Sequence, residues 1–194
     1  MKQQEITTLK LIKSLERDPE QTQRDLAGEL NISLGLVNAF IKRLVKKGHF
    51  KVKTIPKNRI RYILTPAGMY EKTRLTYQYL LYSLEFYKET RHKIRTIYDR
   101  LSDQGKKRVF LIGTSELTEI ALITLQESTL QLAGIIDDKK AGASFLGVVI
   151  SSFQAFNQAR PGDIAMITNP ELEDSLYRTI VEYMSTDSII TLND

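Results

Sequence analysis

The sequence predicts an α+β fold in three successive parts: helices with a β-hairpin, one long helix, and a small α/β part. Apolar residues recur at helical spacing up to Gly48, and two β-rich runs follow it. Between Gly68 and Gly105 there is neither glycine nor proline, which favours a single long helix. From Lys106 onward, β-branched runs alternate with helical segments, as in a doubly wound parallel sheet. The predicted boundaries are residues 1–66, 67–104 and 105–194.

The composition excludes several kinds of site and of membrane segment. The 194 residues include no cysteine, which excludes disulfides and thiolate metal sites, and only two histidines, so no metal site is predicted. The N-terminus lacks the continuous apolar stretch of a signal peptide, and no apolar run approaches the length of a membrane span. These features predict a cytoplasmic protein that has no membrane contact.

Charge is distributed unevenly along the chain. Residues 1–66 hold 14 Lys and Arg against 6 Asp and Glu, which gives a net charge of +8. Residues 106–194 hold 7 Lys and Arg against 12 Asp and Glu, which gives a net charge of −5. A basic end and an acidic end indicate two modules that meet different partners.

Three helices are expected in the basic part, and the first spans Glu5–Leu15. The second is QRDLAGEL, with Thr22 as its N-cap and Asp25 at the capping-box position. Asn31 ends that helix, and Ser33 caps the third. The turn between the second and third helices is very short, which is typical of a helix-turn-helix. The apolar stripe of the third helix is expected at Leu34, Val37, Phe40, Ile41, Leu44 and Val45.

A basic hairpin is expected after the third helix. Its two β-rich runs, HFKVKTI and RIRYILT, are joined by the turn from Pro56 to Arg59. From Lys42 to Arg61 there are nine cations and no acid. Because charge of one sign repels itself, this density favours a polyanionic partner, and we predict a winged helix that binds double-stranded DNA. A solvated basic face without a partner is the alternative.

The start of the third helix is expected to face base edges in the major groove. Asn38 offers a donor and an acceptor that suit adenine, and Gly35 permits close approach to the backbone. Lys42 and Arg43 suit phosphates, and the hairpin is expected to reach a minor groove or a phosphate chain. The predicted DNA-binding residues are Thr22, Gln23, Ser33, Leu34, Gly35, Asn38, Lys42, Arg43, Lys57, Asn58, Arg59 and Arg61.

The helical and hairpin region resembles a known family. The runs TQRDLAGELNISLGLVNAFIKRLVKKGHFKVK and RYILTPAGMYEKTRLT are similar to MarR-type winged-helix regulators, in particular the group associated with exopolysaccharide gene clusters. The resemblance extends over roughly residues 4–100. It implies a homodimeric DNA-binding transcription factor, which we expect to regulate polysaccharide biosynthesis genes.

The long helix is expected to begin at Thr65-Pro66, where a capping hydroxyl precedes a proline at the first turn. Unbroken, it would extend over about 55 Å. Alternating steps of three and four residues describe a heptad seam, which predicts dimerisation through residues 67–104. The alternative is a break near Lys88–Arg91, with the second half packed on the C-terminal part. The seam consists of Tyr70, Thr73, Tyr77, Leu80, Leu84, Tyr87, Arg91, Ile94, Tyr98 and Leu101.

About five strands are expected in the C-terminal part, in the runs KKRVFLIG, LQLAGIID, FLGVVIS, IAMITN and SIITLND. Helices are expected between them in TSELTEIALITLQES, SFQAFNQAR and PELEDSLYRTIVEYMS. Ligands of such sheets lie beyond the carboxyl ends of the strands, where the strand order switches. We therefore expect a ligand site at the carboxyl edge of this sheet.

A nucleotide site is predicted at this edge from two positions. Gly113 stands where a dinucleotide fingerprint begins, although Ser115 and Thr118 replace its second and third glycines. Asp137, 24 residues later, suits a ribose hydroxyl pair. A purely structural role, in which Gly113 makes the turn and the Asp137 pair caps a loop, is the alternative. The predicted ligand-binding residues are Gly113, Thr114, Ser115, Glu116, Asp137, Asp138 and Lys139.

The C-terminal runs also resemble a known family. RVFLIGTSELTEIA and LQLAGIIDDKKAGASFLGVVIS are similar to the Rossmann-like nucleotide-binding N-terminal domains of sugar O-acyltransferases and nucleoside-diphosphate-sugar dehydratases, over roughly residues 106–155. This resemblance implies nucleotide binding, and we expect a sensor or docking role, with a nucleotide, a nucleotide-sugar or NAD(H) as the candidate ligand. No catalytic motif follows, so no enzyme is predicted. A Rex-like redox repressor, a sugar-nucleotide enzyme fragment with an accessory winged helix, and an architectural dimer stay open as alternatives.

Overall fold

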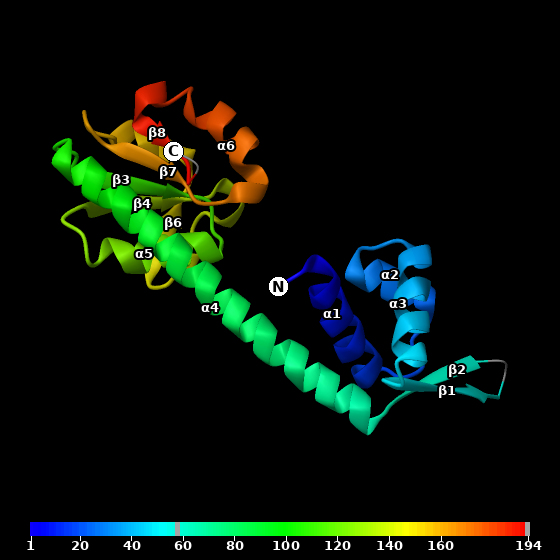
Figure 1. Cartoon of the computed structure of the whole chain (residues 1–194). Coiled ribbons are helices and arrows are strands. Elements are labelled where there is room, and N and C mark those ends of the chain that lie inside the picture. The colour runs from blue at the N-terminus through cyan, green and yellow to red at the C-terminus, as the bar shows by residue number, and fades with distance from the viewer. Residues whose placement is uncertain (57–58, 193–194) are drawn as a thin grey trace. The chain divides into compact units, whose positions relative to one another are not determined.

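The computed structural model describes residues 1–56 and 59–192. The chain forms two compact units, Met1–Glu85 and Phe86–Asp194, and one helix, α4 (Pro66–Asp103), contributes residues to both (Figure 1). Lys57 and Asn58, which were predicted to contact DNA, lie outside the described residues. Within the described ranges, no helix combines the length and apolar character needed to cross a bilayer.

The N-terminal unit is a three-helix cluster from which a two-stranded hairpin extends (Figure 1). The hydroxyl of Thr22 accepts a hydrogen bond from the amide of Asp25, whose side chain completes the capping box. The hydroxyl of Ser33 accepts from the amide of Leu36. These predicted caps are therefore confirmed, as is the helix-turn-helix. Its elements are α1 (Gln3–Arg17), α2 (Gln23–Leu30), α3 (Leu34–Lys46), β1 (Phe50–Ile55) and β2 (Arg59–Leu64).

The core of this unit is built from the apolar stripes of its helices, and Leu75 of α4 is buried in the same cluster. The predicted stripe of α3 is correct for four buried members and for Val45, which is partly buried against the same core, and it is wrong for Leu34, which is 47% exposed. Leu34 is the first residue of α3 and lies at the end where the helix has not yet met the core. The buried members are Val37, Phe40, Ile41 and Leu44.

Gly68 fixes where α4 begins against the hairpin. A Cβ at this position would lie 2.2 Å from the carbonyl oxygen of His49, so only glycine permits the contact. The hydroxyl of Thr65 donates to the carbonyl of Gly48 at 2.6 Å and accepts from the amide of Gly68 at 3.1 Å. The predicted helix start is therefore confirmed, and the base of the hairpin is tied to α4.

The C-terminal unit contains a six-stranded sheet in the order β5-β6-β4-β3-β7-β8. Neighbouring strands are parallel except β5, which runs antiparallel to β6. From β6 to β8 this is the order of a doubly wound sheet, with its switch point between β3 and β7. The predicted parallel sheet is confirmed. The strands are β3 (Arg108–Ile112), β4 (Gln131–Ile136), β5 (Ser144–Phe145), β6 (Val148–Ser151), β7 (Ile164–Ile167) and β8 (Ile189–Ile190).

Two predicted segments of this unit differ in detail. The run FLGVVIS is not one strand, because Leu146 and Gly147 adopt positive φ and turn the chain between β5 and β6. The run SFQAFNQAR forms the 3₁₀ segment η2 (Phe153–Gln158) rather than an α-helix. The other helical elements are α5 (Glu116–Leu125), α6 (Glu173–Ile180), and the short 3₁₀ segments η1 (Asp138–Lys140), η3 (Pro170–Leu172) and η4 (Thr186–Ser188).

The sheet separates two apolar cores. Val109 and Leu111 of β3 belong to the core that includes α4 and α5. Phe110 and Ile112 of the same strand belong to the core that includes η2 and α6. Because successive side chains of a strand point to opposite faces, helices therefore cover both sides of the sheet, as expected for a doubly wound fold.

Helix α4 is continuous through the position where a break was considered. Its second half nevertheless packs within the C-terminal unit, where Ile94, Tyr98 and Leu101 are buried. Arg91 lies 2.6 Å from the carboxylate of Glu127 in an ion pair. These four positions of the predicted seam therefore contact residues of their own C-terminal unit and not a second copy of the chain. The heptad prediction is corrected there, since the same spacing also serves a helix that packs on a sheet.

The middle of α4 is different, because its apolar side chains are exposed. Large apolar residues between Tyr77 and Tyr87 expose between 37% and 61% of their surface. Monomeric proteins rarely expose so many adjacent apolar side chains, and such a patch usually marks an interaction site. The residues concerned are Tyr77, Tyr79, Leu80, Leu81, Tyr82, Leu84, Phe86 and Tyr87.

Candidate nucleic-acid interface

The outward face of α3 carries the residues predicted to read DNA. Ser33, Leu34 and Gly35 are exposed at the start of the helix, and Asn38 is half-buried one turn later. The first turn of α3 holds no acidic residue. A Cβ added at Gly35 would meet no atom within 4 Å, so the fold does not require glycine at this position. Gly35 instead leaves the helix surface low and open to an approaching partner.

Two cations follow on the same helix. Lys42 and Arg43 are exposed, and the guanidinium carbon of Arg43 lies 5.5 Å from the centre of the Phe40 ring. A cation over an aromatic face is attracted to it, which holds the Arg43 side chain along the helix surface. Lys42 has no ion-pair partner among residues 1–56 and 59–192. Both charges are therefore available to an external anion.

The hairpin places its cations on one face. Its antiparallel register pairs Lys53 with Arg61, and Lys51 and Arg59 occupy positions two residues away on their own strands. Because alternate residues of a strand share a face, all four cations point to the same side. Tyr62, on the opposite side, is buried in the core of the unit. The hairpin thus has one packed face and one cationic face.

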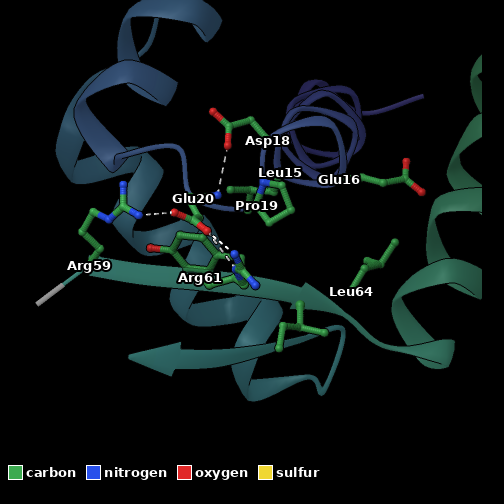
Figure 2. A pocket seen from close by; sticks show the side chains of 10 residues that line it. Leu15, Glu16, Asp18, Pro19, Glu20, Arg59, Arg61 and Leu64 are labelled. Atoms are coloured by element: carbon green, nitrogen blue, oxygen red, sulfur yellow. Dashed lines mark hydrogen bonds and ion pairs between the residues drawn. The ribbon is translucent and has the colours of Figure 1, made fainter. Parts of the chain in front are cut away.

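The segment before α2 brings an acid to this cationic face. Figure 2 shows Glu20 between Arg59 and Arg61, beside an open hollow of about 550 Å³. Arg61 donates from Nε to Oε1 at 3.0 Å and also from Nη2, and Arg59 Nη2 lies 2.7 Å from Oε2. The hydrogen bonds from Arg61 hold the pKa of Glu20 below its ordinary value. Sequence reasoning missed Glu20, because it lies 41 residues from Arg61 and no local pattern connects them.

Backbone and side-chain bonds fasten this segment to β2. The amide of Tyr62 donates to the carbonyl of Pro19 at 2.8 Å. The side-chain amide of Gln23 donates to the hydroxyl of Tyr62 at 3.2 Å. Gln23 was predicted to contact DNA, and the structure shows it half-buried against the hairpin, whereas Thr22 is exposed at the helix start. The start of α2 and the hairpin therefore form one connected surface.

In the C-terminal unit, the predicted ligand residues gather at the carboxyl edge of the sheet. The hydroxyl of Thr114 donates to the carboxylate of Asp137 at 2.6 Å. Ser115 caps α5 by accepting from the amide of Leu117, and its hydroxyl donates to the carbonyl of Thr168 at 2.5 Å. The groups that a nucleotide would use thus bond to one another. Glu116, Asp138 and Lys139 are exposed around them.

Gly113 has a structural reason to be glycine. Its φ is +92°, and a Cβ there would lie 2.7 Å from the Cβ of Asn169. Beside this edge lies a hollow of about 290 Å³ with mostly apolar walls. None of the predicted ligand residues is among its described lining residues, which are Phe86, Thr90, Lys93, Leu117, Ile167, Pro170, Glu173 and Leu192.

Comparisons with known proteins found a family model and solved structures that resemble parts of this chain. A family model described as winged helix-turn-helix DNA-binding matches residues 4–48. The crystal structure of a MarR family transcription regulator is similar at 19% identity and a TM-score of 0.38, over 43% of this chain and 57% of that chain. The PcaV transcriptional regulator from Streptomyces coelicolor, in complex with its natural ligand, is similar at 18% identity and a TM-score of 0.38, over 44% of this chain and 60% of that one.

This chain therefore spans 57% and 60% of the lengths of those two structures. No curated protein matches the chain. The assignment of a winged helix rests on the family model over residues 4–48 and on the capped helices and paired strands of this unit.

Proposed function

We propose that this chain is a transcription regulator of the MarR type that binds double-stranded DNA as a homodimer. The observation that carries the proposal is that α3 and the hairpin expose cations without acids of their own. Phosphate contacts supply much of the affinity for DNA, and exposed lysines and arginines supply those contacts. The surface consists of Lys42, Arg43, Lys51, Lys53, Arg59 and Arg61.

In the proposed complex α3 enters the major groove. Ser33, Leu34 and Gly35 then approach base edges, and Asn38 offers its amide to an adenine. Lys42 and Arg43 lie farther along α3 and contact phosphates. The cationic face of the hairpin contacts the neighbouring backbone or minor groove, where arginine is favoured by the narrow, negative groove of A-tracts.

The proposed dimer forms through the exposed apolar segment Tyr77–Tyr87 of α4. Two copies related by a twofold axis would bury this surface and present two α3 helices to a pseudo-palindromic operator. The dimer segment is shorter than residues 67–104, because the second half of the helix is buried in its own unit. Polysaccharide biosynthesis genes are the proposed targets, on the resemblance of the sequence alone.

The C-terminal unit is proposed to sense an effector at the carboxyl edge of its sheet. The candidate ligands remain a nucleotide, a nucleotide-sugar or NAD(H). The support is the position at the switch point, where doubly wound sheets bind ligands, and the shared helix α4. A ligand would change DNA affinity only by binding the DNA-competent arrangement better or worse than the other. The proposed contacts are Gly113, Thr114, Ser115, Glu116, Asp137, Asp138 and Lys139.

Selection of duplexes from a random library, followed by fluorescence anisotropy across salt concentrations, tests the DNA-binding proposal. The expected result is enrichment of pseudo-palindromic duplexes and an affinity that falls steeply as salt rises. Failure to enrich any duplex, together with no binding at low salt, would contradict it. The same assay with added nucleotides, UDP-sugars, NAD and NADH tests the sensor, and unchanged affinity with each would dispose of that part alone.

A further inference from the structure

We infer that Glu20 is a positioning residue for DNA recognition, which holds the guanidinium groups of Arg59 and Arg61 in one fixed arrangement. This inference rests on the proposed function and concerns its specificity. Glu20 stands outside the recognition helix and the hairpin, and it is acidic on a surface whose partner is an anion. Its contribution to DNA binding therefore comes from the geometry that it imposes on the two arginines and not from charge attraction to DNA.

The carboxylate of Glu20 is less exposed to solvent than the guanidinium groups of Arg59 and Arg61. The Glu20 side chain is 23% exposed, whereas those of Arg59 and Arg61 are 61% and 50% exposed. Each guanidinium carries five N–H donors. Arg61 directs Nε and Nη2 at Glu20, and Arg59 directs only Nη2. Within residues 1–56 and 59–192 neither guanidinium makes another hydrogen bond or ion pair, so the remaining donors can bind a phosphate or a base edge while Glu20 stays bound.

Without Glu20 the cationic face of the hairpin would repel itself. Lys53 and Arg61 are directly opposite each other in the strand register. Like charges at such positions destabilise a strand pair, and the stretch from Lys42 to Arg61 contains no acid to offset them. Glu20 supplies that negative charge from another segment. It draws two arginines toward one point instead of letting them spread apart.

Glu20 is itself held firmly. The carbonyl of the preceding residue, Pro19, accepts a hydrogen bond from the amide of Tyr62 at 2.8 Å. The amide of Glu20 donates to the carboxylate of Asp18 at 3.1 Å (Figure 2). Two residues later, Thr22 caps α2. Glu20 therefore connects the two arginines to the segment that leads into the helix-turn-helix. This fixes the distance between the arginine pair and α3, which a specific site on DNA requires.

Replacing Glu20 with Gln should have two effects of opposite sign. The loss of one negative charge near the DNA strengthens the sequence-independent attraction or leaves it unchanged. The release of two arginines adds side-chain freedom that the specific complex must then remove, which weakens specific binding. The ratio of specific to non-specific affinity should consequently fall, while non-specific affinity does not.

The test compares Glu20→Gln with Glu29→Gln in the full chain. Glu29 pairs with Arg17 at 2.7 Å and also accepts hydrogen bonds from Ser14 and Gln21 in the same unit. Its substitution removes the same charge but leaves Glu20 bonded to both hairpin arginines. Binding is measured by anisotropy on the duplex selected by the wild type and on a scrambled duplex. We expect Glu20→Gln to lower the affinity ratio about tenfold, a range typical of one lost base contact. Glu29→Gln should leave the ratio unchanged, and Glu20→Asp, which keeps the charge, should restore part of it.

Three results would overturn the inference. The ratio of Glu20→Gln could stay within about twofold of wild type, or Glu29→Gln could lower it equally. Both affinities of Glu20→Gln could also fall together with its melting temperature, which would indicate a structural role only. If the wild type itself did not distinguish the two duplexes, the proposed function would fail first, and that result differs from a normal wild type with an unaffected variant.

Discussion

The two units of this protein treat their polar side chains in opposite ways. On α3 and the hairpin of the N-terminal unit, cations face solvent, and within residues 1–56 and 59–192 their ion pairs are those of Arg59 and Arg61 with Glu20. At the carboxyl edge of the C-terminal sheet, Thr114 bonds Asp137, and Ser115 bonds Thr168. The cations of the first surface can therefore bind an anion without rearrangement. The polar groups of the second surface would first have to exchange their bonds to one another for bonds to a ligand.

Helix α4 shows the same contrast within one element. In the N-terminal unit it leaves Leu80 and Leu84 exposed, and in the C-terminal unit it buries Ile94 and Tyr98. The exposed segment has apolar surface left for another molecule, whereas Ile94 and Tyr98 have none. Each of the following predictions breaks or sharpens this contrast.

The largest effect is expected in the buried half of α4. Ile94→Ala should lower the free energy of unfolding of the C-terminal unit by about 2–5 kcal/mol, because it removes fully buried methyl groups. Leu84→Ala, at a side chain that is 48% exposed, should change that free energy far less and should instead weaken self-association. Urea denaturation and sedimentation velocity check the two results. Equal losses of stability would remove the distinction between the halves.

The next effect is on DNA affinity. The double variant Lys42→Ala/Arg43→Ala should lower the slope of log affinity against log salt by about 2, since each phosphate contact contributes about one unit. The matched control is Lys139→Ala/Lys140→Ala, which removes the same charge from the C-terminal unit. Anisotropy titrations at several salt concentrations measure both. A slope that fell equally in the control would mean that the whole molecule, and not one face, attracts DNA.

Two glycines extend the contrast to the backbone. Gly113→Ala should lower the free energy of unfolding by about 1–3 kcal/mol, because φ is positive and Asn169 occupies the space of a Cβ. Gly35→Ala should raise it by about 0.5 kcal/mol, since alanine favours a helix and the space is open. The same Gly35 substitution should weaken specific DNA binding. Thermal unfolding and anisotropy check both, and unaffected DNA binding would remove Gly35 from the interface.

The smallest expected effect is a difference between the two units in how their stability depends on pH. Hydrogen bonds from Arg61 and from Arg74 lower the pKa values of Glu20 and Glu71, so their contribution to stability is present above about pH 4.3 and is lost as pH falls. Burial raises the pKa of Tyr98, whose hydroxyl donates to the carbonyl of Ala121 at 3.1 Å. Its contribution is present below about pH 10 and is lost as pH rises.

The N-terminal unit should therefore weaken first in acid and the C-terminal unit first in alkali. Amide hydrogen exchange, corrected for its intrinsic pH dependence, reports the two units separately. Tyr98→Phe should remove about 1 kcal/mol at neutral pH, through the lost hydrogen bond, and should flatten the alkaline loss. An alkaline loss of the same size in Tyr98→Phe would assign it to other groups.

Local signals in the sequence were sufficient for much of the fold. The caps at Thr22 and Ser33 depend on bonds within three residues, so a short motif contains all the information. The hairpin register follows from the alternation of its two runs. The exposed cations of α3 could be predicted for the same reason, because a helical stripe that is buried on one side defines the other side.

Contacts between distant segments could not be predicted in this way. Glu20 joins Arg61 over 41 residues, and nothing near either residue indicates the other. The second half of the heptad seam was misassigned because a helix on a sheet and a helix in a coiled coil repeat apolar residues at the same spacing. The bond between Thr114 and Asp137 likewise joins two strand ends that the sequence marked only as separate candidates.

The central claim is that α3 and the cationic hairpin face form the surface that meets DNA. Titration of isotope-labelled protein with a selected duplex, followed by amide chemical shifts, tests it most directly. We expect the largest shifts at residues 33–43 and in the two hairpin strands, with little change at residues 113–118. Shifts concentrated at the sheet edge of the C-terminal unit, with α3 unaffected, would contradict it.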